Sequence, residues 1–277
     1  FGLGTILGPA LAPFFVLPGV GLAGPAWLFA LLGVVVTIVV HRWLTDDTPA
    51  ADAAKVHGAA ASEPMLNAQP GGASVIAATA ERNDAKVALS DPRVWPWLLF
   101  GLVAGHVQAA IGQSLGFLII DRLGLPPMAA QPMIGVVLMT GASAALLAQW
   151  GLIPKLRLNP RQLVLWGAAI GAAGAGAIAV AEDLHALAVA YAVVSVGFGF
   201  IRPGFTAGAS LAVDAREQGA VAGKVTSVNG AAFILGPSAG VALYQLWAPL
   251  PYLISAAALA ALVLYALKVI RPSPPAA

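Results

Sequence analysis

The sequence predicts an all-α polytopic membrane protein, and two features carry this prediction. Hydrophobic residues make up 59% of the chain and charged residues only 9%, whereas a soluble domain carries about 25% charged residues. The apolar residues also gather in long stretches separated by short polar or Pro-rich breaks, and each stretch is close to the roughly 20 residues that cross a bilayer. Because these stretches are far longer than barrel strands, and a backbone in lipid must satisfy its own hydrogen bonds, we expect helices.

Eight such stretches follow one another, and a polar segment divides them into two groups. Residues 43–93 contain several Asp, Pro and Gly residues and almost no aromatic residue, which is typical of a flexible linker. We therefore predict a first segment of two spans (1–42), a linker (43–93) and a six-helix bundle (94–277). The eight predicted spans cover residues 1–17, 25–41, 94–120, 131–151, 162–181, 186–212, 220–245 and 251–270.

The basic residues predict the orientation of these spans, because cytoplasmic loops carry the excess of Lys and Arg. Of the 14 basic residues, Arg122 alone falls on the opposite side and Arg202 falls inside a span. The linker and the C-terminus are therefore predicted to be cytoplasmic. The basic residues assigned to that side are Arg42, Lys55, Arg82, Lys86, Arg93, Lys155, Arg157, Arg161, Arg216, Lys224, Lys268 and Arg271.

The composition excludes several classes of function. The basic residues are scattered between apolar stretches and form no cluster that would bind nucleic acid. The chain has no cysteine, and no predicted span pairs carboxylates for a metal or places a nucleophile beside a base, so we expect neither a metal site nor an enzyme. No phosphate-binding GxxxxGK[ST] loop is present to couple transport to ATP. We also expect no acidic residue inside a span, with Asp121, Glu182 and Asp183 in external turns.

A short sequence in the first span is repeated in the seventh. Residues 6–12 read ILGPALA and residues 234–240 read ILGPSAG. Gly and Pro at matching places in two halves of a membrane protein are typical of transporters built from structural repeats. The simpler explanation is that Gly-Pro is a common helix kink and that the match arose by chance.

With this repeat, the chain resembles the major facilitator superfamily, and within it the drug/proton antiporter type. Gly4, Gly8 and Pro9 are similar to the antiporter motif of the fifth helix of that family, although Ala-Pro follows where the family has a Gly-Gly pair. Gly236, Pro237 and Gly240 are similar to the equivalent eleventh helix. Residues 217–223 resemble the segment that enters the eleventh helix of the family, and residues 115–125 resemble the end of its seventh helix.

The resemblance implies that the chain corresponds to helices five to twelve of twelve, with the N-terminal four absent. It implies a substrate site between two helix bundles, no cofactor, and a proton gradient as the energy source. We expect the complete protein to be a monomer in the lipid bilayer that moves a small-molecule substrate. The Ala- and Gly-rich composition favours a bacterial inner membrane.

An ionisable residue inside a span is costly, which makes Arg202 a candidate functional residue. It precedes Pro203, which removes a backbone donor. Ser195, Thr206 and Ser210 fall on the same helical face, so we expect a polar stripe that faces the interior. Arg202 would bind an anionic substrate or pair with a charged residue that takes part in gating. Alternatively, its side chain reaches the membrane interface or pairs with carbonyl groups and stabilises a helix kink.

Two further spans carry candidate polar residues. His106 and Gln113 share a face of the third span, and a histidine titrates near neutral pH, which suits a proton carrier. Asn229, with Thr226 and Ser227, offers a polar contact on the seventh span. The alternative for all of them is hydrogen bonding between packed helices.

These observations leave three hypotheses for function. The first is proton-coupled efflux of an amphipathic organic compound by alternating access between two bundles. The second is proton-coupled uptake of a sugar or organic acid. The third is a membrane scaffold without a substrate, for which the stripe around Arg202 would be unnecessary.

Overall fold

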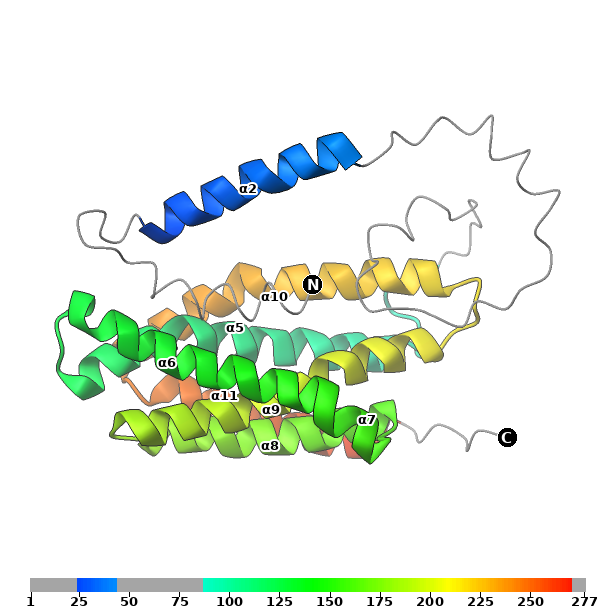
Figure 1. Ribbon diagram of the computed structural model, residues 1–277. Helices are drawn as coiled ribbons and strands as arrows, with labels where there is room; N and C mark the ends of the chain where they lie inside the picture. Colours follow the sequence, from blue (N-terminus) through cyan, green and yellow to red (C-terminus); the bar gives the residue numbers. More distant parts are fainter. Residues whose placement is uncertain (1–23, 44–86, 271–277) are drawn as a thin grey trace.

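The computed structural model describes residues 24–43 and 87–270, and every regular element in these two ranges is a helix (Figure 1). Seven of the helices, counting α6 to α7 as one, are long and apolar enough to cross a membrane, which confirms the predicted fold class. The first predicted span, residues 1–17, lies outside the described residues. The elements are α2 (Gly24–Trp43), α5 (Trp95–Leu123), α6 (Pro127–Leu146), the π-helical turn η2 (Leu147–Leu152), α7 (Ile153–Leu156), α8 (Pro160–Val180), α9 (Leu184–Leu211), α10 (Gln218–Leu246) and α11 (Leu250–Val269).

The seven helices lie where the hydrophobic stretches predict them, to within two residues at most ends, but two of them extend three or more residues beyond the predicted bounds. The fourth predicted span begins at Pro127 and continues through the π-helical turn to Leu156. The third runs to Leu123, so Asp121 lies in its last turn and not in a loop. The prediction that no acid lies inside a helical span is therefore wrong at this position, because hydropathy alone did not show that the helix continues through Asp121 and Arg122.

Helices α5 to α11 form one bundle in which successive long helices run in opposite directions (Figure 1). The most extensive contacts join α8 to α9, α10 to α5, α11 to α8 and α6 to α9. α5 also touches α9 and α11, and it therefore carries much of the core. Leu115, Leu118 and Ile119 of α5 are fully buried.

Small residues allow α8 and α9 to approach closely. A Cβ atom on Gly197 of α9 would lie 2.6 Å from the carbonyl oxygen of Gly167 and 2.6 Å from the nitrogen of Gly171, both in α8. Such contact between backbones is how membrane helices pack where no hydrophobic effect drives them together. Gly167 and Gly171, which are four residues apart on α8, are therefore packing residues.

Most of the described basic residues lie at one end of the bundle, which we call the basic end. It contains the starts of α5, α8 and α10 and the ends of α7, α9 and α11. Arg161, at the start of α8, donates from Nε to the carbonyl oxygen of Ile270 at 2.7 Å and from Nη2 to that of Leu267 at 3.3 Å. The arginine thus satisfies carbonyl groups that the end of α11 leaves without helical partners.

The last residues of the predicted linker pack onto this end. Val87 is only 5% exposed and belongs to the main hydrophobic cluster, so the bundle begins some residues before its first helix. α2, in contrast, exposes nearly all of its apolar side chains. An apolar helix of this kind requires cover by lipid or by other helices.

Candidate functional site

Two of the predicted site residues, His106 and Arg202, lie at a similar depth in the bundle. His106 is the twelfth residue of α5 and Arg202 the tenth from the end of α9, so at 1.5 Å per residue each is about 14–18 Å from the basic end and within the hydrocarbon core. Asn229 of α10 lies one to two turns nearer that end, because Gly236, seven residues after it, is the residue that contacts the turn of His106. Thr206 lies one turn nearer that end than Arg202, and Gln113 two turns farther from it than His106. α5 packs against both α9 and α10, so His106, Arg202 and Asn229 belong to contacting helices.

The ring of His106 has one nitrogen occupied. Its Nδ1 lies 2.8 Å from the carbonyl oxygen of Leu102, one turn earlier in α5, and the side chain is partly buried. Because a carbonyl oxygen can only accept, Nδ1 carries a hydrogen and donates it. In the neutral ring Nε2 is then the acceptor, and it is the nitrogen at which a proton can be taken up.

The Gly-Pro motif of α10 lies against the same turn of α5. A Cβ atom on Gly236 would lie 3.0 Å from the carbonyl oxygen of His106, and one on Gly240 would lie 2.5 Å from that of Ala110. α10 continues from Gln218 to Leu246 through Pro237 without a break. The motif thus brings α10 against the backbone of the histidine turn. Its counterpart, Gly4, Gly8 and Pro9, lies outside the described residues.

The predicted polar stripe on α9 is not uniform in its surroundings. Ser195 is buried, and its hydroxyl oxygen would lie 2.6 Å from a Cβ atom on Gly141 of α6, so it faces a tight contact between helices. Arg202 and Ser210 are half-buried, whereas Thr206 is exposed. Residues four apart on a helix differ by about 40° in direction, and Thr206 therefore lies at the edge of the stripe. That the stripe faces the interior of the complete protein stays a prediction.

The other candidate polar residues also differ in exposure. Gln113 is exposed, and Asn229 is half-buried. The hydroxyls of Thr226 and Ser227 donate to the carbonyl oxygens of Ala222 and Gly223 in their own helix, both at 3.0 Å. These two residues therefore satisfy their hydroxyls within α10, not across to a neighbouring helix.

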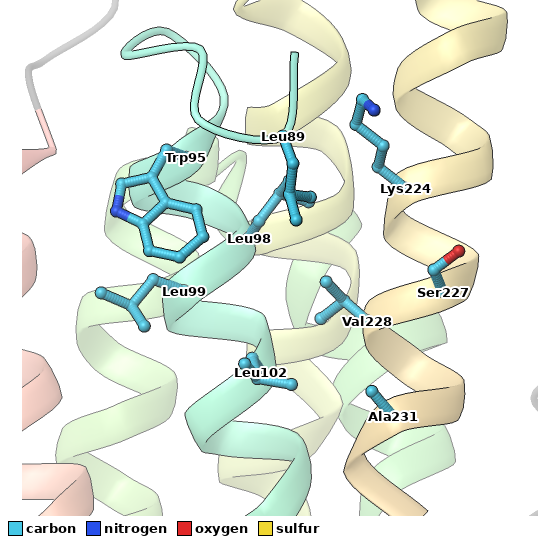
Figure 2. Close-up of a pocket in the computed structure, with 9 residues that line it drawn as sticks. All are labelled: Leu89, Trp95, Leu98, Leu99, Leu102, Lys224, Ser227, Val228 and Ala231. Carbon is cyan, nitrogen blue, oxygen red and sulfur yellow. The ribbon is translucent and has the colours of Figure 1, made fainter. Parts of the chain in front are cut away.

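A cavity of about 360 Å³ lies between the first turns of α5 and α10, near the basic end (Figure 2). Its walls are apolar apart from Lys224 and Ser227. Of the candidate polar residues, Ser227 lines the cavity, and Arg202, His106, Gln113, Thr206 and Asn229 do not.

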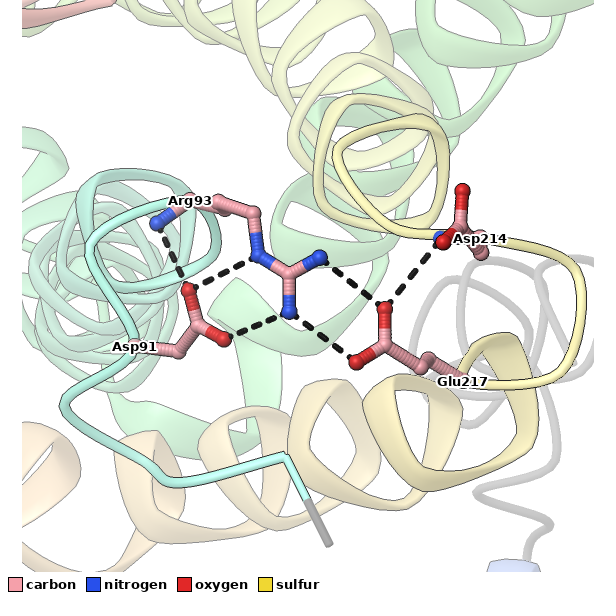
Figure 3. Close-up of polar contacts among 4 residues, drawn as sticks. All are labelled: Asp91, Arg93, Asp214 and Glu217. Carbon is pink, nitrogen blue, oxygen red and sulfur yellow. Dashed lines mark hydrogen bonds and ion pairs between the residues drawn. The ribbon is translucent and has the colours of Figure 1, made fainter. Parts of the chain in front are cut away.

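The sequence analysis missed a cluster of charged residues at the basic end (Figure 3). The guanidinium group of Arg93 binds Asp91 at 2.8 Å and both carboxylate oxygens of Glu217 at 3.0 Å. Glu217 also accepts from the backbone nitrogen of Asp214 at 3.3 Å. The cluster ties the start of α5 to the turn between α9 and α10. In the sequence Arg93 and Glu217 are far apart, and each reads only as a charged loop residue.

The cluster lowers the pKa of both acids. The side-chain hydrogen bonds from Arg93 are the main cause for Asp91 and for Glu217, whose ordinary pKa values are 3.8 and 4.5. The same bonds raise the pKa of Arg93. The stabilisation is therefore complete above pH 4.5 and is lost as the pH falls through the lowered values in the folded protein.

We expect this link to loosen in acid, which can be measured by the distance between spin labels. The chain has no cysteine, so labels can be placed at Ser90 and at Gly219, an exposed glycine with open space around it. The distance distribution should be narrow at neutral pH and broaden in acid, at a pH below the ordinary pKa values of 3.8 and 4.5. The Arg93→Gln variant should be broad at every pH. A wild-type distribution that stays narrow until the helices themselves unfold would contradict the prediction.

The opposite end of the bundle holds a second polar contact that the sequence did not reveal. The hydroxyl of Tyr244 in α10 donates to a carboxylate oxygen of Asp121 in α5, and its ring centroid lies 6.1 Å from that of Phe117. α5 and α10 are thus joined by polar contacts at both ends and by the glycine contact between them.

Comparison with known proteins identifies the family. A search of individually curated proteins gave no match. The profile of the Major Facilitator Superfamily matches residues 1–223, from before α2 to the first turns of α10. This range exceeds half of the chain and agrees with a helical bundle of membrane-spanning length. The chain therefore belongs to the Major Facilitator Superfamily, whose members are secondary transporters and not enzymes.

Proposed function

We propose that the protein exports a small amphipathic organic compound in exchange for protons, by alternating access. The observation that carries this proposal is the similar depth of His106 and Arg202 on two contacting helices, with Asn229 one to two turns nearer the basic end on a third. A transporter needs polar groups near the membrane midplane, where substrate and coupling ions bind. The Gly-Pro motif beside His106 supports the antiporter type, because it resembles the motif of that type.

We further propose that the chain corresponds to helices five to twelve of a twelve-helix transporter and that the complete protein is a monomer. The distribution of basic residues supports a cytoplasmic basic end. The composition supports a bacterial inner membrane. In this arrangement the second bundle would complete the binding site from the other side.

The test is a substrate-dependent proton flux in vesicles. The protein, produced from its complete gene, would be reconstituted into vesicles that contain a pH-sensitive dye, with an imposed pH gradient. Tetraphenylphosphonium, ethidium and salicylate serve as cationic and anionic probes. Antiport predicts that a probe moving in one direction drives protons in the other. Movement of probe and protons in the same direction would identify a symporter, and a flux equal to that of empty vesicles would overturn the transport proposal.

His106→Asn is expected to abolish the proton flux while leaving exchange of labelled for unlabelled probe intact. Asparagine can keep a hydrogen bond to the backbone, but it cannot take up a proton near neutral pH. Exchange at equal pH needs no net proton movement, so its rate should stay close to the wild-type rate. Both activities falling together would instead assign His106 a role in packing against α10.

A further inference from the structure

The cavity between α5 and α10 has the shape of a groove that runs along the two helices (Figure 2). One end is lined by Trp95 and Lys224, and the other by Leu102 and Ala231. Seven residues separate the two ends on each helix, so the groove is about 10 Å long. It begins at the basic end and extends into the depth of the bilayer core.

Lys224 is the charged residue in this groove. Asp214 and Glu217 are the acids nearest to Lys224 in the turn before α10. Neither forms an ion pair with Lys224, and Glu217 binds Arg93 instead. Among the described residues, no ion pair includes Lys224. The hydroxyl of Ser227 already donates to Gly223 within α10. The ammonium group of Lys224 is therefore the lining group that can attract an anion.

Trp95 and Lys224 together indicate the depth of the groove mouth. Trp95 is 41% exposed at the start of α5, and tryptophan is enriched where a membrane helix meets the headgroups. A basic residue at this level attracts anionic lipids. Below the mouth the walls are apolar, which suits an acyl chain that lies parallel to the helices.

The size and chemistry of the groove favour a lipid chain over a protein segment. A helix with its side chains is about 10–12 Å across, which is too wide for a cavity of about 360 Å³. An extended peptide would bring backbone groups that the apolar walls cannot satisfy. An acyl chain carries no polar group, and its headgroup would meet the ammonium group at the mouth.

We propose that this groove binds an anionic phospholipid of the leaflet at the basic end, with one acyl chain between α5 and α10 and the phosphate on Lys224. The groove is separate from Arg202, His106, Gln113, Thr206 and Asn229, which do not line it. Ser227 lines it, but its hydroxyl donates within α10. Its test needs no transported solute and so stands apart from the transport proposal.

Quenching of Trp95 by brominated lipid tests the site directly. The protein would be placed in phosphatidylcholine vesicles that contain a minor fraction of phosphatidylglycerol or of phosphatidylcholine brominated in the acyl chains. The difference between the wild type and Trp95→Phe isolates the signal of Trp95. We expect brominated phosphatidylglycerol to reach half-maximal quenching at about fivefold lower mole fraction than brominated phosphatidylcholine, the preference that one basic residue near the surface confers.

Three variants make the test specific. Lys224→Gln should remove the preference for phosphatidylglycerol, whereas Lys268→Gln should keep it, because Lys268 is an exposed lysine at the same end outside the groove. Ala231→Leu should fill the groove and reduce quenching by both lipids. An unchanged preference in Lys224→Gln would overturn the proposal. Quenching of Trp95 by neither lipid would overturn it as well, since protein would then cover the groove.

Discussion

Gly197→Ala is expected to destabilise the bundle by about 1–3 kcal/mol, even after the gain in helix propensity of up to about 1 kcal/mol. The new methyl group would lie 2.6 Å from the carbonyl oxygen of Gly167 and 2.7 Å from the Cα atom of Gly171. These neighbours are backbone atoms, which cannot rotate away as a side chain can. α8 and α9 would have to separate along the most extensive helix contact of the structure.

Gly112→Ala is the matched control for this prediction. Gly112 is also a helical glycine, in α5, but a Cβ atom there meets nothing within 4 Å. We expect it to unfold at the wild-type temperature or slightly above, because alanine favours the helix by up to about 1 kcal/mol. Thermal unfolding in detergent measures both variants. Equal unfolding temperatures for Gly197→Ala and Gly112→Ala would show that the contact between α8 and α9 can relax.

The positions of the seven described spans could be predicted because lipid imposes a simple rule. A helix that crosses a bilayer must be long and apolar, and the seven described helices between Gly24 and Val269 follow this rule. The gathering of most described basic residues at one end of the bundle was predictable from the positions of the spans. That this end is cytoplasmic stays a prediction. The hydropathy of a span is a local property of the sequence, so each span can be predicted without knowing which helices it contacts.

The contacts between helices could not be predicted in this way, because they depend on which faces meet. Arg93 and Glu217 pair across 124 residues, and Tyr244 reaches Asp121 across 123. Nothing in the hydropathy of either segment marks its partner. Thr226 and Ser227 do not hydrogen-bond to a neighbouring helix through their hydroxyls, because each hydroxyl donates to a carbonyl oxygen of its own helix. The sequence alone does not distinguish these two arrangements. Depth along a helix, in contrast, follows from residue counting once the ends are known, and this groups His106 with Arg202. The offset between α5 and α10, which places Asn229 nearer the basic end, depends on helix contacts that the sequence does not mark.

Arg202→Gln is expected to reduce the affinity for an anionic probe about ten- to hundredfold while leaving the fold intact. A hydrogen bond to a charged partner contributes about 1.5–3 kcal/mol, and 1.4 kcal/mol corresponds to a factor of ten. Arg202 also interacts with other residues of the bundle, so the unfolding temperature of the variant is measured beside the affinity. Binding of labelled salicylate to the reconstituted protein measures the affinity.

Arg161→Gln is the matched control, for which we expect a change in unfolding temperature and not in affinity. Arg161 holds the end of α11 through the carbonyl oxygens of Ile270 and Leu267 and lies at the basic end, far from the depth of Arg202. Its loss should lower the unfolding temperature but leave the affinity of the folded protein for salicylate unchanged. If Arg202→Gln lowers the unfolding temperature and leaves the affinity unchanged, Arg202 serves the packing around Pro203. The cost of placing its charge in the membrane would then be offset by structure and not by substrate binding.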